Sequence, residues 1–310
     1  MLRAVVAFVN LGRPLFLVGG FLLYGLGAAV AAYAGARIDT GHYLAGQLAV
    51  TVFQLMTHYA NDYFDFEADT ANLTPTRWSG GSRVLLAGVI PRRAALVAAL
   101  VLGAAGLAVS LYAGTRAGVG PLVVPAFVAM GVLAWFYSGP PLRLCGTGLG
   151  ELDTALVVTG LVPFAALALQ DPALHGLRVL LLALVPPAAL QVAMLLAIEL
   201  PDAAGDARAG KRTLVVRWGG WCGARLYAAV TAIPFLLLPL LAAAGLPVLV
   251  AVAAAVPAPV ALWRIRRALH GDWRRPWRWE AFAFWAVALL VATSAAELAA
   301  FLVLNLLGSR

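Results

Sequence analysis

Long apolar runs, each about as long as a membrane-spanning helix, alternate with short polar connections along this chain. A helix needs roughly 20 mainly apolar residues to cross the hydrocarbon core of a bilayer. On this criterion the sequence predicts nine spans, at about residues 14–34, 44–64, 94–113, 117–137, 152–170, 178–199, 225–244, 246–263 and 281–305. The pattern therefore predicts an all-α, polytopic membrane protein, folded as a single transmembrane domain over residues 1–310.

Composition and charge agree with this prediction. Of the 310 residues, 63% are hydrophobic and 12% are charged, whereas a soluble domain is usually about 25% charged. The net charge of +8 would also suit a nucleic-acid-binding protein, but the positions of the 22 basic residues argue against that function. With the N-terminus inside, four of them fall on the outer side, namely Arg37, Arg116, Arg178 and Arg310. This asymmetry predicts a cytoplasmic N-terminus in the cell membrane, with the lipid bilayer as partner and no nucleic acid.

Three long polar connections, 65–93, 200–224 and 264–280, fall on the predicted cytoplasmic side. The third is basic and rich in tryptophan, which is typical of an interfacial anchor. The first two contain both acidic and basic residues. The first two are therefore the candidate functional segments.

One spacing occurs twice in these connections and the spans before them: a glutamine, an aspartate 11 residues later, and another aspartate four residues after that. The series is Gln54, Asp65 and Asp69 at the second span, and Gln191, Asp202 and Asp206 at the sixth. The repetition suggests two four-helix pseudo-repeats followed by a ninth helix.

On a helix, the polar residues of each series share one face, within an arc of roughly 80° for the first. Carboxylates crowded on one stripe repel each other, so arginine partners or metal ions must offset their charge. Carboxylates and an asparagine carbonyl are hard oxygen ligands that suit Mg²⁺, and Arg208, Lys211 and Arg212 follow the second series. The alternative is a salt-bridge network that closes the cytoplasmic face. Because the motif occurs twice, we favour a metal and diphosphate site.

Three further polar residues lie close to the two motifs in the sequence. His58 precedes Asn61 by one helical turn and is interpreted as a structural hydrogen-bonding residue. Asp62 lies off the centre of the stripe, in a position to cap or orient its neighbours. Glu199 is compatible with orienting an acceptor, acting as a base, or pairing with a basic residue.

At these residues the chain resembles the UbiA-type intramembrane prenyltransferases. The family's NxxxDxxxD motif is matched by Asn61, Asp65 and Asp69, and its DxxxD motif by Asp202 and Asp206, followed by Gly210-Lys211-Arg212-Thr213. A tyrosine-led segment after the fourth span is matched by 137–143. The resemblance covers essentially the whole chain.

The resemblance implies a function and a set of site residues. Mg²⁺ held by Asn61, Asp65, Asp69, Asp202 and Asp206 would bind a polyprenyl diphosphate, and Asp65 and Asp202 would be essential to catalysis. Positive charge near the diphosphate would come from Lys211, Arg143, Arg208 and Arg13, with Asn61 also at the substrate. Tyr137 would stabilise the allylic cation through its ring face.

Within the superfamily the likeness is greatest to the 1,4-dihydroxy-2-naphthoate polyprenyltransferases of menaquinone biosynthesis. It rests on HYANDYFDFEAD, on 78–85 and on GTGLGE at 146–151. Those enzymes usually carry Asn-Asn where this chain has Ile198-Glu199, which leaves the aromatic acceptor open. Alternatives are another phenol, a chlorin, haem or glycerol phosphate as acceptor, terpene cyclisation, and, in a different class, a transporter. The sequence does not indicate the prenyl chain length or the oligomeric state.

Lys211 is the only lysine in the chain. A compact ammonium suits a phosphate oxygen, whereas a carboxylate partner is better served by a bidentate arginine. The sequence therefore predicts that Lys211 binds the donor's diphosphate rather than bracing Asp202 or Asp206.

Overall fold

A computed structural model describes residues 2–308, and this part of the chain is helical with no strand. The α-helices are α1 (Leu2–Leu11), α2 (Leu17–Tyr33), α3 (Thr40–Phe64), α4 (Phe66–Ala71), α5 (Arg92–Arg116), α6 (Gly120–Phe136), α7 (Gly150–Leu156), α8 (Val162–Gln170), α9 (Leu177–Ala183), α10 (Val185–Arg208), α11 (Leu214–Ala243), α12 (Val248–Ala255), α13 (Ala258–Leu269) and α14 (Pro276–Gly308). Short helical turns are η1 (Pro14–Phe16), η2 (Leu144–Gly146), η3 (Val157–Leu161, a π-turn) and η4 (Asp272–Arg274). Arg310 lies outside the described residues.

The predicted spans fall on helices, singly or as consecutive pieces. Within residues 2–308, six helical runs are long and apolar enough to cross a membrane, and the bent pair α12–α13 makes a seventh candidate. α6 is apolar but shorter, and α3 is long but carries many polar side chains. The protein is thus an all-helical, multi-pass membrane protein, and the count of nine spans stays a prediction.

Two of the predicted polar connections are largely helical instead. α10 continues to Arg208 and α11 begins at Leu214, while α13 continues to Leu269. A helix forms its backbone hydrogen bonds internally, whatever the polarity of its side chains. A helix can therefore continue beyond the apolar span into water, where its polar side chains are solvated. α11 is bent at Gly219, whose positive φ of 79° only glycine adopts easily. Helix α1, which the apolar runs did not predict, precedes the first span.

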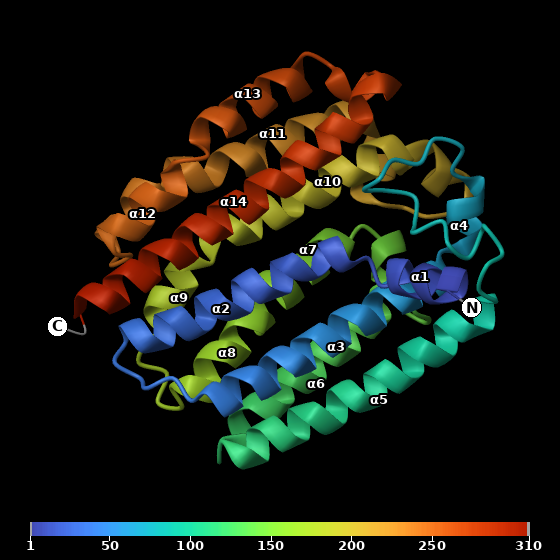
Figure 1. The fold of residues 1–310 in the computed structure, drawn as a ribbon. Helices are drawn as coiled ribbons and strands as arrows, with labels where there is room; N and C mark the ends of the chain where they lie inside the picture. The colour runs from blue at the N-terminus through green and yellow to red at the C-terminus, as the bar shows by residue number, and fades with distance from the viewer. Residues whose placement is uncertain (1, 309–310) are drawn as a thin grey trace.

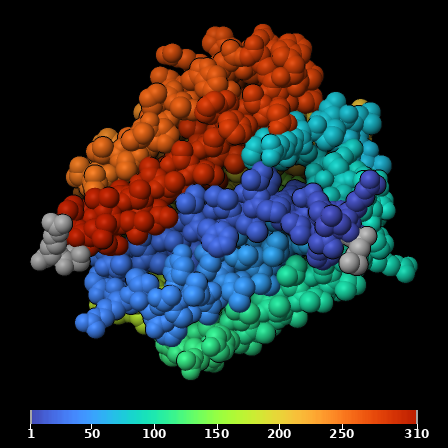
Figure 2. All heavy atoms as spheres, in the orientation of Figure 1, coloured from blue at the N-terminus to red at the C-terminus, as the bar shows by residue number. Residues whose placement is uncertain are grey.

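The helices run roughly along one direction, and the polar segments gather at one end of the bundle (Figure 1). This end holds α1, α4, the C-terminal end of α10 and the connection from α13 to α14. The last turn of α14 lies at the opposite end. The segment after α3 covers the polar end between α1 and α14 (Figure 2), where the Arg77 N–H donates to Glu280 Oε2 at 2.8 Å.

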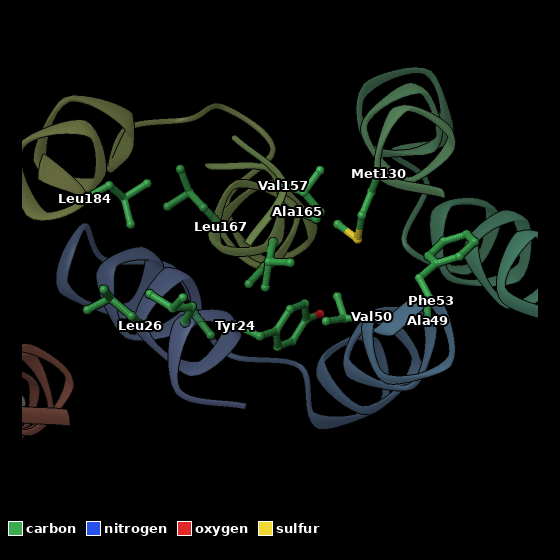
Figure 3. Close-up of a cluster of buried hydrophobic side chains, with 14 of the residues drawn as sticks. Tyr24, Leu26, Ala49, Val50, Phe53, Met130, Val157, Ala165, Leu167 and Leu184 are labelled. Atoms are coloured by element: carbon green, nitrogen blue, oxygen red, sulfur yellow. The ribbon is translucent and has the colours of Figure 1, made fainter. Parts of the chain in front are cut away.

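Buried hydrophobic side chains fill the space between the helices (Figure 3). Small residues let the helices approach closely. The Phe53 ring of α3 lies against Gly106 and Gly131, where an added Cβ would come within 2.6 and 2.7 Å of it. At Gly27 of α2, a Cβ would lie 2.0 Å from the Pro163 carbonyl oxygen. Close backbone approach at small residues is a common way for helices to pack within a membrane.

Candidate functional site

The first acidic motif spans the end of α3 and the start of α4. The N–H groups of Asp65 and Asp69 donate to the carbonyls four residues earlier, each at 2.8 Å. Helical spacing therefore continues across the break between the two helices. Asn61 Nδ2 donates to Asp65 Oδ2 at 2.8 Å and to Ser138 Oγ at 2.8 Å, so asparagine and aspartate form one polar group beside the end of α6.

The second motif lies on the last turns of α10, after Pro201. Asp202 accepts hydrogen bonds from Asn72 Nδ2 at 2.7 Å and from the Gly80 N–H at 3.0 Å. Both donors belong to the connection that follows the first motif. The connection from α4 to α5 therefore links the two acidic motifs, which lie 133 residues apart when counted from Asp69 to Asp202.

Lys211 joins the motifs directly. Its Nζ lies 2.9 Å from Asp65 Oδ2 and 3.5 Å from Asp206 Oδ1. Burial alone would lower the pKa of Lys211, but Asp65 and the neighbouring acidic groups raise it well above its ordinary value. The expectation that Lys211 would not brace Asp206 is therefore wrong: the tight turn at Gly210, with a φ of 76°, directs the lysine back onto the acids. Its expected phosphate contact stays a prediction.

Arg13 reaches the first motif from the turn between α1 and η1. It donates to Asn61 Oδ1 at 3.2 Å and forms an ion pair with the buried Asp62. Asp62 also accepts from the hydroxyl and the N–H of Ser82. Asp62 thus holds Arg13 and the connection before α5 in place. This agrees with the expectation that Asp62 caps or orients its neighbours.

Arg143 and Arg208 lie at the rim of the site. Arg143 donates to the Phe64 carbonyl at 3.1 Å, at the end of α3. Arg208 donates to the Ala71 carbonyl at 3.5 Å, at the end of α4. Cationic side chains at helix C-termini interact favourably with the helix dipole, so these contacts stabilise the two helix ends that carry the first motif.

The backbone of the connection approaches Asp69 very closely. Gly81 has a φ of 76°, and a Cβ there would lie 1.9 Å from Asp69 Oδ2. Burial, together with the adjacent Asp65 carboxylate, raises the pKa of Asp69 to about 7.

A cavity of about 240 Å³ lies next to the motifs inside the bundle. At its polar end are Arg13, His58, Asn61 and Tyr137. Elsewhere its walls are mainly apolar side chains of α2, α3, α6, α10 and α14, with both repeat-related glutamines, Gln54 and Gln191, among them. The arrangement suits a ligand with an anionic head and an apolar tail.

The donor set suits Mg²⁺ shared with phosphate oxygens. Among residues 2–308, no three acidic, histidine or cysteine side chains already converge as a cluster. Mg²⁺ is usually bound by one or two carboxylates together with waters and substrate phosphates, not by an all-protein cage. Asp65 with Asp69, and Asp202 with Asp206, are two such pairs of oxygen donors, and ionised carboxylates keep free lone pairs besides their present contacts.

Several residues of the site were not predicted from the sequence. Asn72 and Ser82 hold Asp202 and Asp62, and Ser138 contacts Asn61. Asp153 lines the cavity from α7. The segment containing Gly80, Gly81 and Ser82 was noted for its resemblance, but its contacts with the acids depend on how the connection folds.

Known proteins include relatives of this chain that share its sequence pattern or its fold. A digeranylgeranylglyceryl phosphate synthase from Thermococcus gammatolerans is 28% identical over 192 residues, which is 60% of this chain. The match spans 62% of that relative's length.

Solved structures share the fold along most of the chain. A UbiA homolog from Archaeoglobus fulgidus bound to GPP and Mg²⁺ has a TM-score of 0.61 and 17% identity, covering 94% of this chain and 99% of its own. A UbiA homolog from Aeropyrum pernix K1 has a TM-score of 0.64 and 16% identity, covering 89% and 96%.

The family comparison covers most of the helical bundle. The model of the UbiA prenyltransferase family matches residues 21–288, a range that contains both acidic motifs, Lys211 and the spans that carry them. The chain belongs to the UbiA prenyltransferase family.

Proposed function

We propose that this protein transfers a prenyl group from its diphosphate to an acceptor inside the membrane, with Mg²⁺ as cofactor. The observation that carries the proposal is the meeting of two acidic motifs, joined through Lys211, at the polar end of an apolar cavity. The Archaeoglobus relative bound to GPP and Mg²⁺ supports the donor class and the metal.

One set of residues would bind the metal and the diphosphate, and another would surround the prenyl chain. Mg²⁺, held by Asn61, Asp65 and Asp69 and by Asp202 and Asp206, would neutralise the charge that develops on the leaving diphosphate. Lys211 and Arg13 would contact its remaining oxygens, because both cations already lie among the acids. Arg143 and Arg208 would contribute positive potential from the rim.

The cavity would hold the reacting carbon and its tail away from water. Departure of diphosphate from an allylic carbon leaves a cation that water would capture, so an apolar lining protects the transfer. Tyr137 lines the cavity beside Asn61, where its ring face would stabilise the positive charge.

For the acceptor we place a glyceryl phosphate alcohol first. The Thermococcus relative, a digeranylgeranylglyceryl phosphate synthase, supports this class through a match over 192 residues. An aromatic acceptor, 1,4-dihydroxy-2-naphthoate of menaquinone biosynthesis, is the second candidate, supported by the segments 58–69, 78–85 and 146–151. The departure at Ile198-Glu199 counts against the aromatic acceptor.

A direct assay decides between these acceptors. Purified protein in lipid nanodiscs is incubated with Mg²⁺, labelled geranylgeranyl diphosphate and either a prenylated glyceryl phosphate or dihydroxynaphthoate. We expect Mg²⁺-dependent transfer to the glyceryl phosphate, abolished by a chelator. Transfer only to the naphthoate would establish the second candidate, and no transfer to any acceptor would refute the proposed activity.

We further propose a cell-membrane location with nine spans, a cytoplasmic N-terminus and a single domain. The distribution of basic residues supports the orientation. The gathering of the polar segments at one end of the bundle, with the last turn of α14 at the other, is consistent with it (Figure 1).

A further inference from the structure

Asp153 is a buried acid in the cavity that the diphosphate site does not use. It lies on α7 and lines the cavity, and the residue is 7% exposed. The π-turn η3 follows directly and places Val157 and Val158 in the same wall. π-turns inside helices occur often at functional sites.

Asp153 differs from the acids of the two motifs in what surrounds it. Asp65 is held by Lys211, Asp62 by Arg13, and Asp202 by amide donors. Asp153 Oδ1, by contrast, is buried without a hydrogen-bond partner anywhere in residues 2–308. An unpaired buried carboxylate is costly, so a donor supplied by a ligand in the cavity would stabilise it.

Other buried acids lack this combination of features. Glu151 and Glu199 also carry buried carboxylate oxygens without a hydrogen-bond partner in residues 2–308, but neither residue lines the cavity. Glu297 on α14 is fully buried with both carboxylate oxygens unpartnered, but the described lining of the cavity does not include it. Asp153 combines burial, a free oxygen and a position in the cavity wall.

We infer that Asp153 binds the nucleophilic hydroxyl of the acceptor and takes its proton during transfer. The inference rests on the proposed function with an alcohol acceptor. The allylic C–O bond of the donor breaks, and diphosphate leaves with the electron pair. A lone pair of the acceptor oxygen forms the new C–O bond, and the hydroxyl proton passes to the Asp153 carboxylate. Atoms and charge balance without an oxidant or a further reactant.

The test compares Asp153→Asn with wild type in nanodiscs, using the prenylated glyceryl phosphate as acceptor. The carboxamide keeps the size of the side chain but cannot take the proton. General-base catalysis typically contributes 10²–10⁴-fold, so we expect kcat to fall by about 100-fold or more. Mg²⁺-dependent binding of geranylgeranyl diphosphate should stay unchanged, because Asp153 lies outside the diphosphate site. Asp153→Glu, which keeps a carboxylate, should retain more activity than Asp153→Asn.

Glu297→Gln is the matched control, because it makes the same chemical change at a buried, unpartnered acid outside the cavity. Its kcat should equal that of wild type. If wild type prenylates the acceptor and Asp153→Asn does so within about threefold, the Asp153 assignment is wrong while the proposed function stands. A loss of donor binding in Asp153→Asn would instead indicate a structural role and overturn the assignment. If wild type itself does not prenylate this acceptor, the proposed acceptor and the inference both fail.

His58 is the rival base, because it lines the polar end of the same cavity. His58→Gln is therefore measured in parallel. A loss of kcat in His58→Gln, with normal kcat in Asp153→Asn, would assign proton removal to the imidazole and refute the carboxylate.

Discussion

Side chains of the two acidic motifs are linked to each other, and Lys211 links them directly. Its ammonium contacts Asp65 and Asp206, which come from different halves of the chain. A lysine in this position neutralises repulsion between the acids and remains free to exchange one carboxylate for a phosphate oxygen. A structural role and the proposed substrate-binding role would then be combined in one side chain.

Replacement of Lys211 by methionine tests both roles. Hydrogen bonds to charged groups contribute about 1.5–3 kcal/mol, so Lys211→Met should lower the free energy of unfolding by roughly 2 kcal/mol without substrate. It should also weaken Mg²⁺-dependent donor binding by at least about tenfold, which corresponds to 1.4 kcal/mol. Thermal melting with and without Mg²⁺ and donor measures both quantities. Normal donor affinity in a destabilised variant would show that Lys211 is only a structural counter-ion.

Substitution of Asp65 or Asp202 by asparagine tests whether the acidic motifs form a metal site or a salt-bridge network. A bound metal provides several kcal/mol of charge stabilisation, and each 1.36 kcal/mol is a factor of ten in rate. Either variant should therefore lose about 100-fold or more in turnover. Asp272→Asn is the control, because Asp272 is a buried acid paired with Arg267 at 2.7 Å. It should lose stability but keep turnover within about threefold. Comparable turnover in all three variants would support the network.

The sequence was sufficient to identify the acids of the motifs but not their partners. Asn61, Asp65, Asp69, Asp202 and Asp206 follow from spacing and resemblance, because both depend only on order along the chain. The contact of Asn72 with Asp202 joins residues 130 apart. Such contacts depend on the path of an irregular connection, which no periodic pattern encodes.

At the scale of elements, the connection from α4 to α5 positions both motifs. It donates to Asp202 through Gly80 and to Asp62 through Ser82, and its backbone passes against Asp69 at Gly81. The connection therefore shapes the site from the side that faces the end of the bundle.

Alanine at Gly81 should displace Asp69 and reduce activity. Its Cβ would lie 1.9 Å from Asp69 Oδ2, and the φ of 76° adds backbone strain. Gly88→Ala provides the control, because Gly88 has a similar φ of 68° but its Cβ would meet no described atom within 4 Å. Both variants should lose roughly 1–2 kcal/mol of stability. Turnover and the Mg²⁺ dependence of the rate should change only in Gly81→Ala, and equal effects in both would exclude a specific contact with Asp69.

The extents of the helices could be predicted only where the sequence is apolar. The runs at 94–113 and 281–305 lie within α5 and α14. Helix ends that carry charged side chains, such as the last turns of α10 and α13, resemble loops in an apolar pattern although their backbones stay helical. α1 was missed because ten residues are too few for a span.

At the scale of the whole molecule, the two halves of the chain meet around the cavity. α3 contributes Gln54 and α10 contributes Gln191 to its walls, and each helix continues into an acidic motif at the same end. Two similar half-sites facing each other would account for a short spacing that recurs so far apart in the sequence. The repeat itself remains a prediction from that spacing.

The orientation of the bundle is the final prediction. The basic residues place the motif end in the cytoplasm, and the connection from α2 to α3 lies at the opposite end (Figure 1). Single cysteines are introduced at Leu73 and Ile38, which are 78% and 42% exposed, after Cys145 and Cys222 are changed to serine. A membrane-impermeant maleimide should label Ile38→Cys in intact cells, and Leu73→Cys only after permeabilisation. The reverse pattern would place the motifs outside and refute the orientation, whereas labelling of both positions in intact cells would contradict a bundle that spans the membrane between them.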